Sequence, residues 1–350
     1  NKYSYHDDAV LFSIGATYSS GRWMLGILDE WIKKSTGSFH YSMPLFNGVL
    51  VIVFIALACM LISDLFEIES RVLQAALTGI MVTFPVVTGL FGYIYTAPYY
   101  FFGTFMGIGG VWLWSKFHKW YVCLAGIILM ACSVGVYQAN IPVCVSLILI
   151  NMIKTTKERR IFRWRDLLWH YLTCVAVCIG FLGVYLGLNK LFLWVKDIRL
   201  TNYQEIGTYG QTSFKGYLDR IKSAYTYFFS PKDGIQCMYP FSLDKIYSMI
   251  IVFLIVFTMY LIFKKLKENV ALGIQIFVLA MLIPLATNFI YLMCSISIIH
   301  TLMMYGQAFV YVYLIWILND ILKSENIWMH ICVANVVVMM LFLLCIGYCR

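Results

Sequence analysis

The sequence predicts an all-α fold, a polytopic bundle of transmembrane helices with two longer segments that lie outside the membrane. Of its 350 residues, 61% are hydrophobic and only 12% are charged, against roughly 25% charged in an ordinary soluble domain. A water-soluble globule could not hide this much apolar surface, so the surplus is expected to face lipid. The formal net charge of +9 lies largely in short loops between apolar runs, which indicates membrane topology and argues against a nucleic-acid partner.

Ten apolar runs approach the length of about 20 residues that a membrane-spanning helix needs. They are 45–66, 71–94, 99–115, 120–137, 140–153, 167–188, 246–263, 270–292, 299–318 and 327–348. The fifth run is short and contains Pro142, so it is expected to tilt, break or re-enter the membrane.

The connections between these runs fall into two sets of very different basic content. One set, 67–71, 115–120, 154–166, 264–268 and 319–326, has 13 Lys and Arg in 37 residues. The other set includes the two long segments, which have 12 Lys and Arg in 101 residues, and short turns without any. Because cytoplasmic loops are enriched in Lys and Arg, the first set is predicted to be cytoplasmic and both long segments to lie outside.

The chain is accordingly divided into an outer segment at 1–44, spans at 45–188, a large outer loop at 189–245 and spans at 246–350. Each outer segment contains an amphipathic stretch, which predicts a helix in the membrane interface or docked on the bundle. In the first, apolar residues from Trp23 to Trp31 share one helical face, with Asp29 and Glu30 away from it. The polar start at Asn1 suggests that a further helix precedes this fragment.

Two adjacent carboxylates, Asp7 and Asp8, are the most pointed candidates for chemistry. A sugar transfer that inverts the anomeric carbon needs one carboxylate to accept the proton of the acceptor hydroxyl. The other could orient it, or the pair could hold a divalent cation such as Mg or Mn. A solvated turn or a helix cap would explain the same pair. Arg22 is a candidate for binding the donor phosphate, since its guanidinium suits phosphate geometry.

A second group of candidates lies at the expected outer ends of the spans. Tyr95 and Tyr99 are either part of an interfacial aromatic belt or part of a sugar site. Tyr137 and Gln138, beside the helix break, could stack on a sugar ring and bond its hydroxyls, with His300 nearby. In the large outer loop, Arg220 and Lys222 alternate with aromatic residues, which is typical of phosphosugar binding and also of loops that lie on a membrane.

With these residues in view, the chain resembles the GtrII-type membrane glucosyltransferases, which modify bacterial surface polysaccharides. The resemblance rests on Asp7-Asp8, Ser20-Gly21-Arg22-Trp23, Gly135-Val136-Tyr137-Gln138-Ala139 and the segment that begins at His300. It implies a helical bundle of the GT-C class with an acidic catalytic loop after the first span. It also implies an undecaprenyl-phosphate sugar donor and transfer on the periplasmic or extracellular face of the bacterial inner membrane. The helix that should precede the acidic loop is absent from this sequence.

The expected function is therefore transfer of a hexose, in the first instance glucose, from polyprenyl phosphate to a surface glycan or a teichoic-acid-like acceptor. A polysaccharide polymerase or ligase is an alternative, which would rely on Arg or His in the large outer loop. A flippase for lipid-linked sugars is a non-enzymatic alternative. The spans are poor in the mid-membrane charged residues that a carrier path requires.

Overall fold

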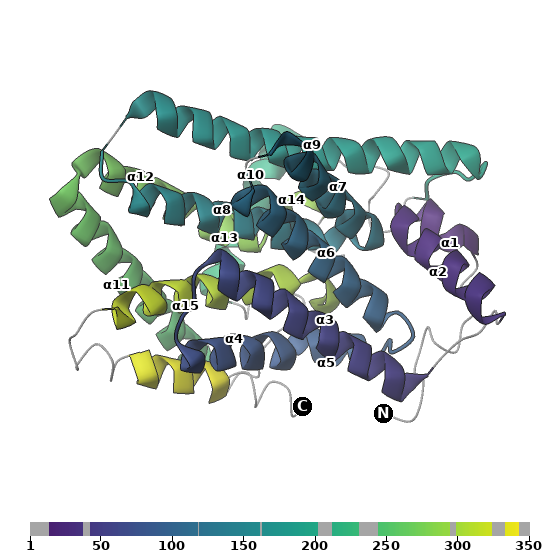
Figure 1. Ribbon diagram of the computed structural model, residues 1–350, viewed down its shortest axis with the longest axis horizontal. Helices are drawn as coiled ribbons and strands as arrows, with labels where there is room; N and C mark the ends of the chain where they lie inside the picture. The colour runs from purple at the N-terminus through teal and green to yellow at the C-terminus, as the bar shows by residue number, and fades with distance from the viewer. Residues whose placement is uncertain are drawn as a thin grey trace.

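The computed structural model describes residues 14–37, 43–117, 119–161, 163–201, 212–230, 244–294, 299–323 and 333–342. Every regular element in these ranges is a helix (Figure 1), which confirms the predicted all-α fold. The α-helices of the first half are α1 Ile14–Ser19, α2 Trp23–Thr36, α3 Pro44–Leu65, α4 Arg71–Thr83, α5 Pro85–Phe91, α6 Ala97–Lys116, α7 Trp120–Val136, α8 Ile141–Glu158 and α9 Trp164–Val195. Those of the second half are α10 Phe214–Phe229, α11 Asp244–Glu268, α12 Val270–Met281, α13 Ile283–Thr287, α14 Ile290–Met293 and α15 Ala308–Leu322, followed by a helix at Val333–Phe342.

Six stretches of helix in the described part are long and apolar enough to cross a membrane. They are Pro44–Leu65, Gln138–Glu158, Trp164–Val195, Lys245–Glu268, Val270–Thr287 and Tyr305–Leu322. The pair α4 and α5, bent by 43°, makes a seventh if it counts as one span, and Trp120–Val136 and Val333–Phe342 are shorter apolar helices. The protein is thus a multi-pass membrane protein.

Prolines account for where the helices differ from the predicted runs. The run 71–94 is interrupted between Thr83 and Pro85, because the residue before a proline avoids the α conformation. By contrast, Pro142 does not break its helix. It sits in the first turn of α8, where a proline removes no intrahelical hydrogen bond. Of the three outcomes expected for 140–153, a break within the helix is therefore wrong. The helix α8 continues to Glu158 after a single 3₁₀ turn at Gln138–Asn140.

The most buried spans are those that contain α15 and α8, and α9 is the span with the most surface free to face lipid. In the span that contains α15, 89% of the most apolar window is buried inside the protein, against 22% in α9. Figure 1 shows α9 lying along the outside of the bundle. With 32 residues, it is about 48 Å long, longer than the roughly 30 Å of a hydrocarbon core.

Close packing of α6 on α7 depends on two glycines. A Cβ added at Gly110 would lie 2.6 Å from the carbonyl oxygen of Gly126, and a Cβ at Gly126 would lie 2.6 Å from the carbonyl oxygen of Gly110. The two backbones therefore touch, as small residues allow in membrane helices.

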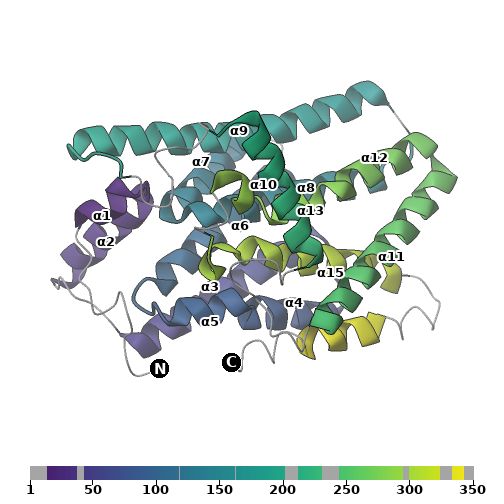
Figure 2. The same cartoon turned by 180° about the vertical axis from the view of Figure 1, so that it is seen from behind.

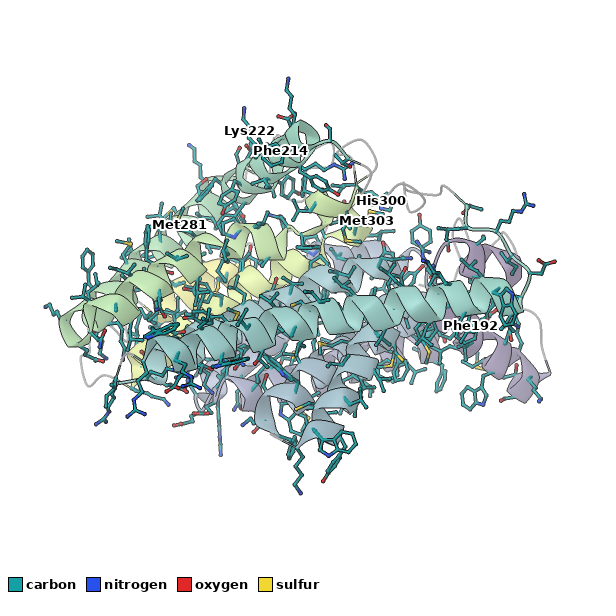
Figure 3. All side chains as sticks on the ribbon, turned by 90° about the horizontal axis from the view of Figure 1, so that it is seen from above. Phe192, Phe214, Lys222, Met281, His300 and Met303 are labelled. Atoms are coloured by element: carbon teal, nitrogen blue, oxygen red, sulfur yellow. The ribbon has the colours of Figure 1, made fainter. Side chains whose placement is uncertain are left out.

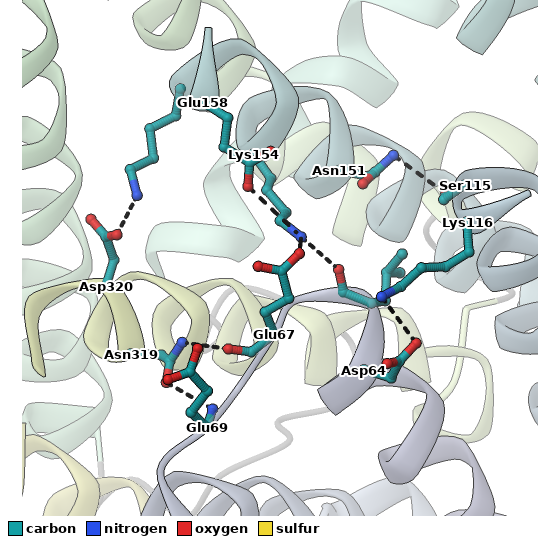
Figure 4. A network of polar contacts seen from close by, with 12 residues as sticks. Asp64, Glu67, Glu69, Ser115, Lys116, Asn151, Lys154, Glu158, Asn319 and Asp320 are labelled. Atoms are coloured by element: carbon teal, nitrogen blue, oxygen red, sulfur yellow. Dashed lines mark hydrogen bonds and ion pairs between the residues drawn. The ribbon is translucent and has the colours of Figure 1, made fainter. Parts of the chain in front are cut away.

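The connections rich in Lys and Arg meet at one end of the bundle (Figure 4). Lys154 of α8 bonds the loop after α3 through Glu67, and Lys116 at the end of α6 pairs with Asp64. Further ion pairs join Lys157 to Asp320 and Lys323 to Glu69. The loop at 67–71 is also bonded by Asn319, whose amide donates to the carbonyl of Glu67. The sequence grouping of these connections thus matches their place in the fold.

At the opposite end, α1 and α2 pack on the ends of α7 and α9 (Figure 1). The Trp23 ring stacks on Phe192 of α9, with 5.4 Å between centroids. Lys196, which follows α9, forms an ion pair of 2.8 Å with Glu30 of α2. Seen from behind, α10 crosses the bundle against α13 and α14 (Figure 2).

Both amphipathic stretches are helical. The predicted apolar face of α2 packs on the bundle through Trp23, Met24, Ile27 and Leu28, but two residues depart from the pattern. Trp31 is 65% exposed, whereas Asp29, expected on the polar face, is only 5% exposed. The Asp29 carboxylate accepts a hydrogen bond of 2.8 Å from Tyr95 and pairs with Lys33 at 2.6 Å. Burial of a charge requires such partners. Lys33 follows from its i,i+4 spacing to Asp29, whereas Tyr95 is not apparent from the periodicity of α2.

Candidate functional site

The candidate site is built around Arg22, in the turn between α1 and α2. Gly21 has φ +74°, a left-handed conformation that favours glycine. The reversal is closed by backbone hydrogen bonds from Gly21 to Tyr18 and from Arg22 to Thr17. Because the turn is short and bonded, the position of the Arg22 side chain is defined by the packing of α1 and α2 on the bundle.

The Arg22 guanidinium lies against two stacked tyrosines. It is 5.0 Å from the centroid of the Tyr137 ring, and its Nη1 donates a hydrogen bond of 3.2 Å to the Tyr100 hydroxyl. The rings of Tyr100 and Tyr137 are stacked, with centroids 4.7 Å apart. Arginine binds aromatic faces in this way while keeping its planar set of donors. The structure therefore brings two of the predicted site residues, Arg22 and Tyr137, into contact.

Gln138 and Tyr185 hold the turn that carries Arg22. The buried amide of Gln138 donates to the carbonyl of Ser20 at 2.8 Å and to the Tyr185 hydroxyl at 3.2 Å. That hydroxyl in turn donates to the carbonyl of Gly21 at 3.1 Å. Gln138 was predicted to bond sugar hydroxyls; its contacts here are to the protein and position the Arg22 turn.

The positive charge of Arg22 acts electrostatically on His300. It precedes the 3₁₀ turn at Thr301–Met303, outside the spanning helices, and its side chain is half-buried. Burial and the positive charge of Arg22 both lower the pKa of His300. The imidazole is thus held neutral at pH 7 and can both donate and accept a hydrogen bond.

Tyr95 precedes α6, and Tyr99 lies in its first turn. Tyr95 bonds Asp29, and its ring meets the buried ring of Tyr99 edge to face, with 6.3 Å between centroids. These two residues help to dock α2 on the bundle.

Arg220 and Lys222 belong to α10. Arg220 donates to the carbonyls of Leu292 and Met293, which fixes α10 to the end of α14. Lys222 is exposed and points outward from the bundle, whereas His300 lies lower, against it (Figure 3).

Asp7 and Asp8 lie outside the described residues, so the structure does not test the predicted general base or a cation held by this pair. Among the residues that are described, there is no cluster of three His, Cys, Asp or Glu side chains able to hold a metal.

Two residues of the site are missing from the sequence-based candidates. Tyr100 stands in the aromatic run 93–100, next to the candidate Tyr99. Tyr185 is a tyrosine within the long apolar run of α9, and a polar hydroxyl at such a depth is the signal that could have identified it.

The fold and this arrangement are those of a multi-pass membrane protein with a polar, aromatic site at one end of its helices. A sequence model of the family described as Glucosyl transferase GtrII matches residues 1–313. The chain belongs to this family of membrane glucosyltransferases. Searches of curated proteins and of solved structures gave no match.

Proposed function

We propose that this glucosyltransferase takes glucose from a polyprenyl-phosphate donor, of the undecaprenyl type, and transfers it to a cell-surface glycan on the outer face of the bacterial inner membrane. The observation that carries the proposal is the guanidinium of Arg22, 5.0 Å from the Tyr137 centroid and close to a neutral His300. A cation presented beside aromatic rings at the end of a membrane bundle combines phosphate binding with sugar stacking.

The orientation is supported by the distribution of charge. The Arg22 group lies at the end opposite the connections that are dense in Lys and Arg. Because such connections are enriched on the cytoplasmic side, the Arg22 group belongs to the outer side in this proposal.

Asp7 and Asp8 precede α1 closely enough to serve the same site. Six residues of chain reach at most about 22 Å, so Asp8 is tethered within that distance of the start of α1 at Ile14. Either carboxylate is proposed as the general base, with its neighbour assisting. Lys222, exposed on α10, would add positive charge that attracts the donor phosphate.

The proposed reaction is a single displacement at the anomeric carbon. The carboxylate accepts the proton of the acceptor hydroxyl while the acceptor oxygen forms a bond to C1 of glucose. The bond from C1 to the phosphate oxygen breaks, and polyprenyl phosphate leaves with the electron pair. Arg22 stabilises the negative charge that develops on this leaving group. The product has the opposite anomeric configuration from the donor.

The proposal is tested with membranes that contain the wild type or one of the single variants Asp7→Asn and Asp8→Asn. Transfer of radiolabelled glucose from glucosyl undecaprenyl phosphate to surface polysaccharide should fall at least a hundredfold in one of them. Lys34→Gln, a change at an exposed residue of α2, is the control and should leave transfer unchanged. Full activity in both aspartate variants would refute the assignment of the base.

Orientation is tested separately by cysteine labelling in intact cells. A membrane-impermeant maleimide should label Lys34→Cys from outside and should fail to label Lys267→Cys, which is exposed at the basic end. The seven cysteines in the described part of the chain are buried or half-buried, which keeps their background low. If Lys267→Cys were labelled and Lys34→Cys were not, the membrane orientation would be opposite to the one proposed.

A further inference from the structure

A cleft of about 530 Å³ opens at the basic end of the bundle, away from the Arg22 group. It lies where α3, α6 and α8 end and α7 and α9 begin. Its polar lining consists of Glu67, Ser115, Lys116, Asn151, Lys154, Thr155, Glu158, Arg159, His170 and Thr173. Nothing in the proposed glucosyl transfer uses these residues.

The three cations of the cleft differ in how their charges are balanced. Lys154 is almost buried, 8% exposed, and is satisfied by the Leu65 carbonyl at 3.0 Å and by Glu67 at 2.7 Å. Lys116 forms an ion pair with Asp64 (Figure 4). The same carboxylate accepts a hydrogen bond from the indole of Trp112.

Arg159, by contrast, forms no ion pair with any residue in the described ranges. The nearby Glu158 is 3.8 Å from Lys154 and therefore belongs to the Lys154 group. The rim of the cleft thus presents one cation whose charge is not matched and a second, Lys116, that is only partly covered, with 32% of its side chain exposed.

The other walls of the cleft are apolar, and they lead onto lipid-facing surface. Leu65, Trp114 and Phe117 line the interior. Beside the cleft, α7 and α9 pack together and expose an apolar strip. The strip consists of Leu124 and Ile128 of α7 with Leu172, Val175 and Ile179 of α9, each 42–66% exposed.

Two exposed tryptophans mark the level of the membrane interface at this cleft. Trp120 at the start of α7 is 77% exposed, and Trp169 near the start of α9 is 62% exposed. Tryptophan concentrates where hydrocarbon meets the headgroup region. The cleft therefore lies at the depth of lipid headgroups, with apolar helix surface leading away from it.

We propose that this cleft binds the phosphate of an anionic membrane phospholipid. Arg159 and Lys116 would contact the phosphate oxygens, because guanidinium and ammonium groups make charge-assisted bonds to phosphate. The hydroxyl and amide side chains of the lining form hydrogen bonds with the rest of the headgroup. The acyl chains lie on the strip formed by α7 and α9. A lipid bound here contacts the ends of three helices and the starts of two, and so stabilises the folded protein.

The test compares lipid binding by two double variants with the same loss of charge. The cleft variant, Lys116→Gln with Arg159→Gln, removes both rim cations. The control variant, Lys119→Gln with Arg160→Gln, removes two exposed cations that are close to them in sequence but do not line the cleft. Delipidated protein in detergent is titrated with phosphatidylglycerol or phosphatidylcholine, and binding is measured by native mass spectrometry and by the shift in thermal unfolding midpoint.

The affinity of the cleft variant for phosphatidylglycerol should be at least about tenfold lower than that of the wild type. The control variant should bind phosphatidylglycerol as the wild type does, and the affinity for phosphatidylcholine should be the same in all three proteins. Equal weakening in both double variants would overturn the site, because it would indicate diffuse attraction to a basic surface. Stabilisation by inorganic phosphate equal to that by phosphatidylglycerol would overturn the lipid assignment. Should the double variant fold poorly, Arg159→Gln alone carries the test, since this side chain makes no ion pair in the described ranges.

Discussion

The side-chain amide of Gln138 donates a hydrogen bond of 2.8 Å to the backbone carbonyl of Ser20. Through this contact, the corner between α7 and α8 fixes the turn from which Arg22 extends. The same amide bonds Tyr185 of α9. Three parts of the chain that are distant in sequence therefore determine where one guanidinium lies.

Replacement of Gln138 by Leu should weaken donor binding more than it slows the chemical step. The change leaves the buried Ser20 carbonyl without its donor, which costs about 1–3 kcal/mol of folding stability and loosens the turn. We expect KM for the lipid-linked donor to rise several-fold and the thermal midpoint to fall. Steady-state kinetics with a thermal scan would check this. An unchanged KM at a lowered midpoint would show that Gln138 serves stability alone.

Arg22→Lys should lose activity even though the positive charge remains. An ammonium cannot lie flat on the Tyr137 ring and bond Tyr100 with the same geometry. We expect kcat/KM to fall about tenfold or more. A tenfold fall corresponds to a loss of about 1.4 kcal/mol of transition-state stabilisation. The measurement is transfer of radiolabelled sugar at several donor concentrations, with Lys34→Gln as the matched exposed control. Wild-type kinetics in Arg22→Lys would contradict a specific role for the guanidinium.

Acid should destabilise the protein through His300. Its pKa is lowered by burial and by Arg22, so the unfolded chain binds a proton at higher pH than the folded protein does. Stability is therefore complete above the unfolded pKa of about 6.5 and declines as the pH falls from there towards the folded pKa. Thermal midpoints measured from pH 7.5 to 5 should show this decline. His300→Gln should flatten it, and an identical pH profile in that variant would exclude His300 as its source.

The contact of α6 with α7 predicts a sharp contrast between two glycines. Gly110→Ala places a methyl group 2.6 Å from the Gly126 carbonyl and should cost about 1–3 kcal/mol. At Gly183 of α9, nothing lies within 4 Å of an added Cβ, so Gly183→Ala should be neutral or slightly stabilising. Thermal unfolding in detergent compares the two. A similar midpoint for both variants would mean that the backbones can separate without loss.

Some of these features follow from the sequence and others depend on tertiary contacts. The spacing of apolar residues predicts the helices that became α2 and α10, and the density of Lys and Arg correctly groups the connections of one end. The burial of Asp29 could not be predicted, because Tyr95 is distant in sequence.

The site shows the same division between local and tertiary signals. Arg22 and Tyr137 could be chosen by residue type, since arginine suits phosphate and an aromatic ring suits a sugar. The link from Gln138 to Ser20 and Tyr185 depends on how α7, α8 and α9 meet, and nothing near those residues in sequence encodes it.

One consequence follows from the length of α9. Near its start, His170 and Thr173 line the cleft at the basic end, and near its finish, Tyr185 bonds the turn of Arg22. A helix longer than the hydrocarbon core adjusts to a thinner or thicker bilayer by changing its tilt. Because α9 touches both ends, such a change would shift both together. Sugar transfer in reconstituted vesicles should accordingly vary with acyl chain length, even with lipids of identical headgroup.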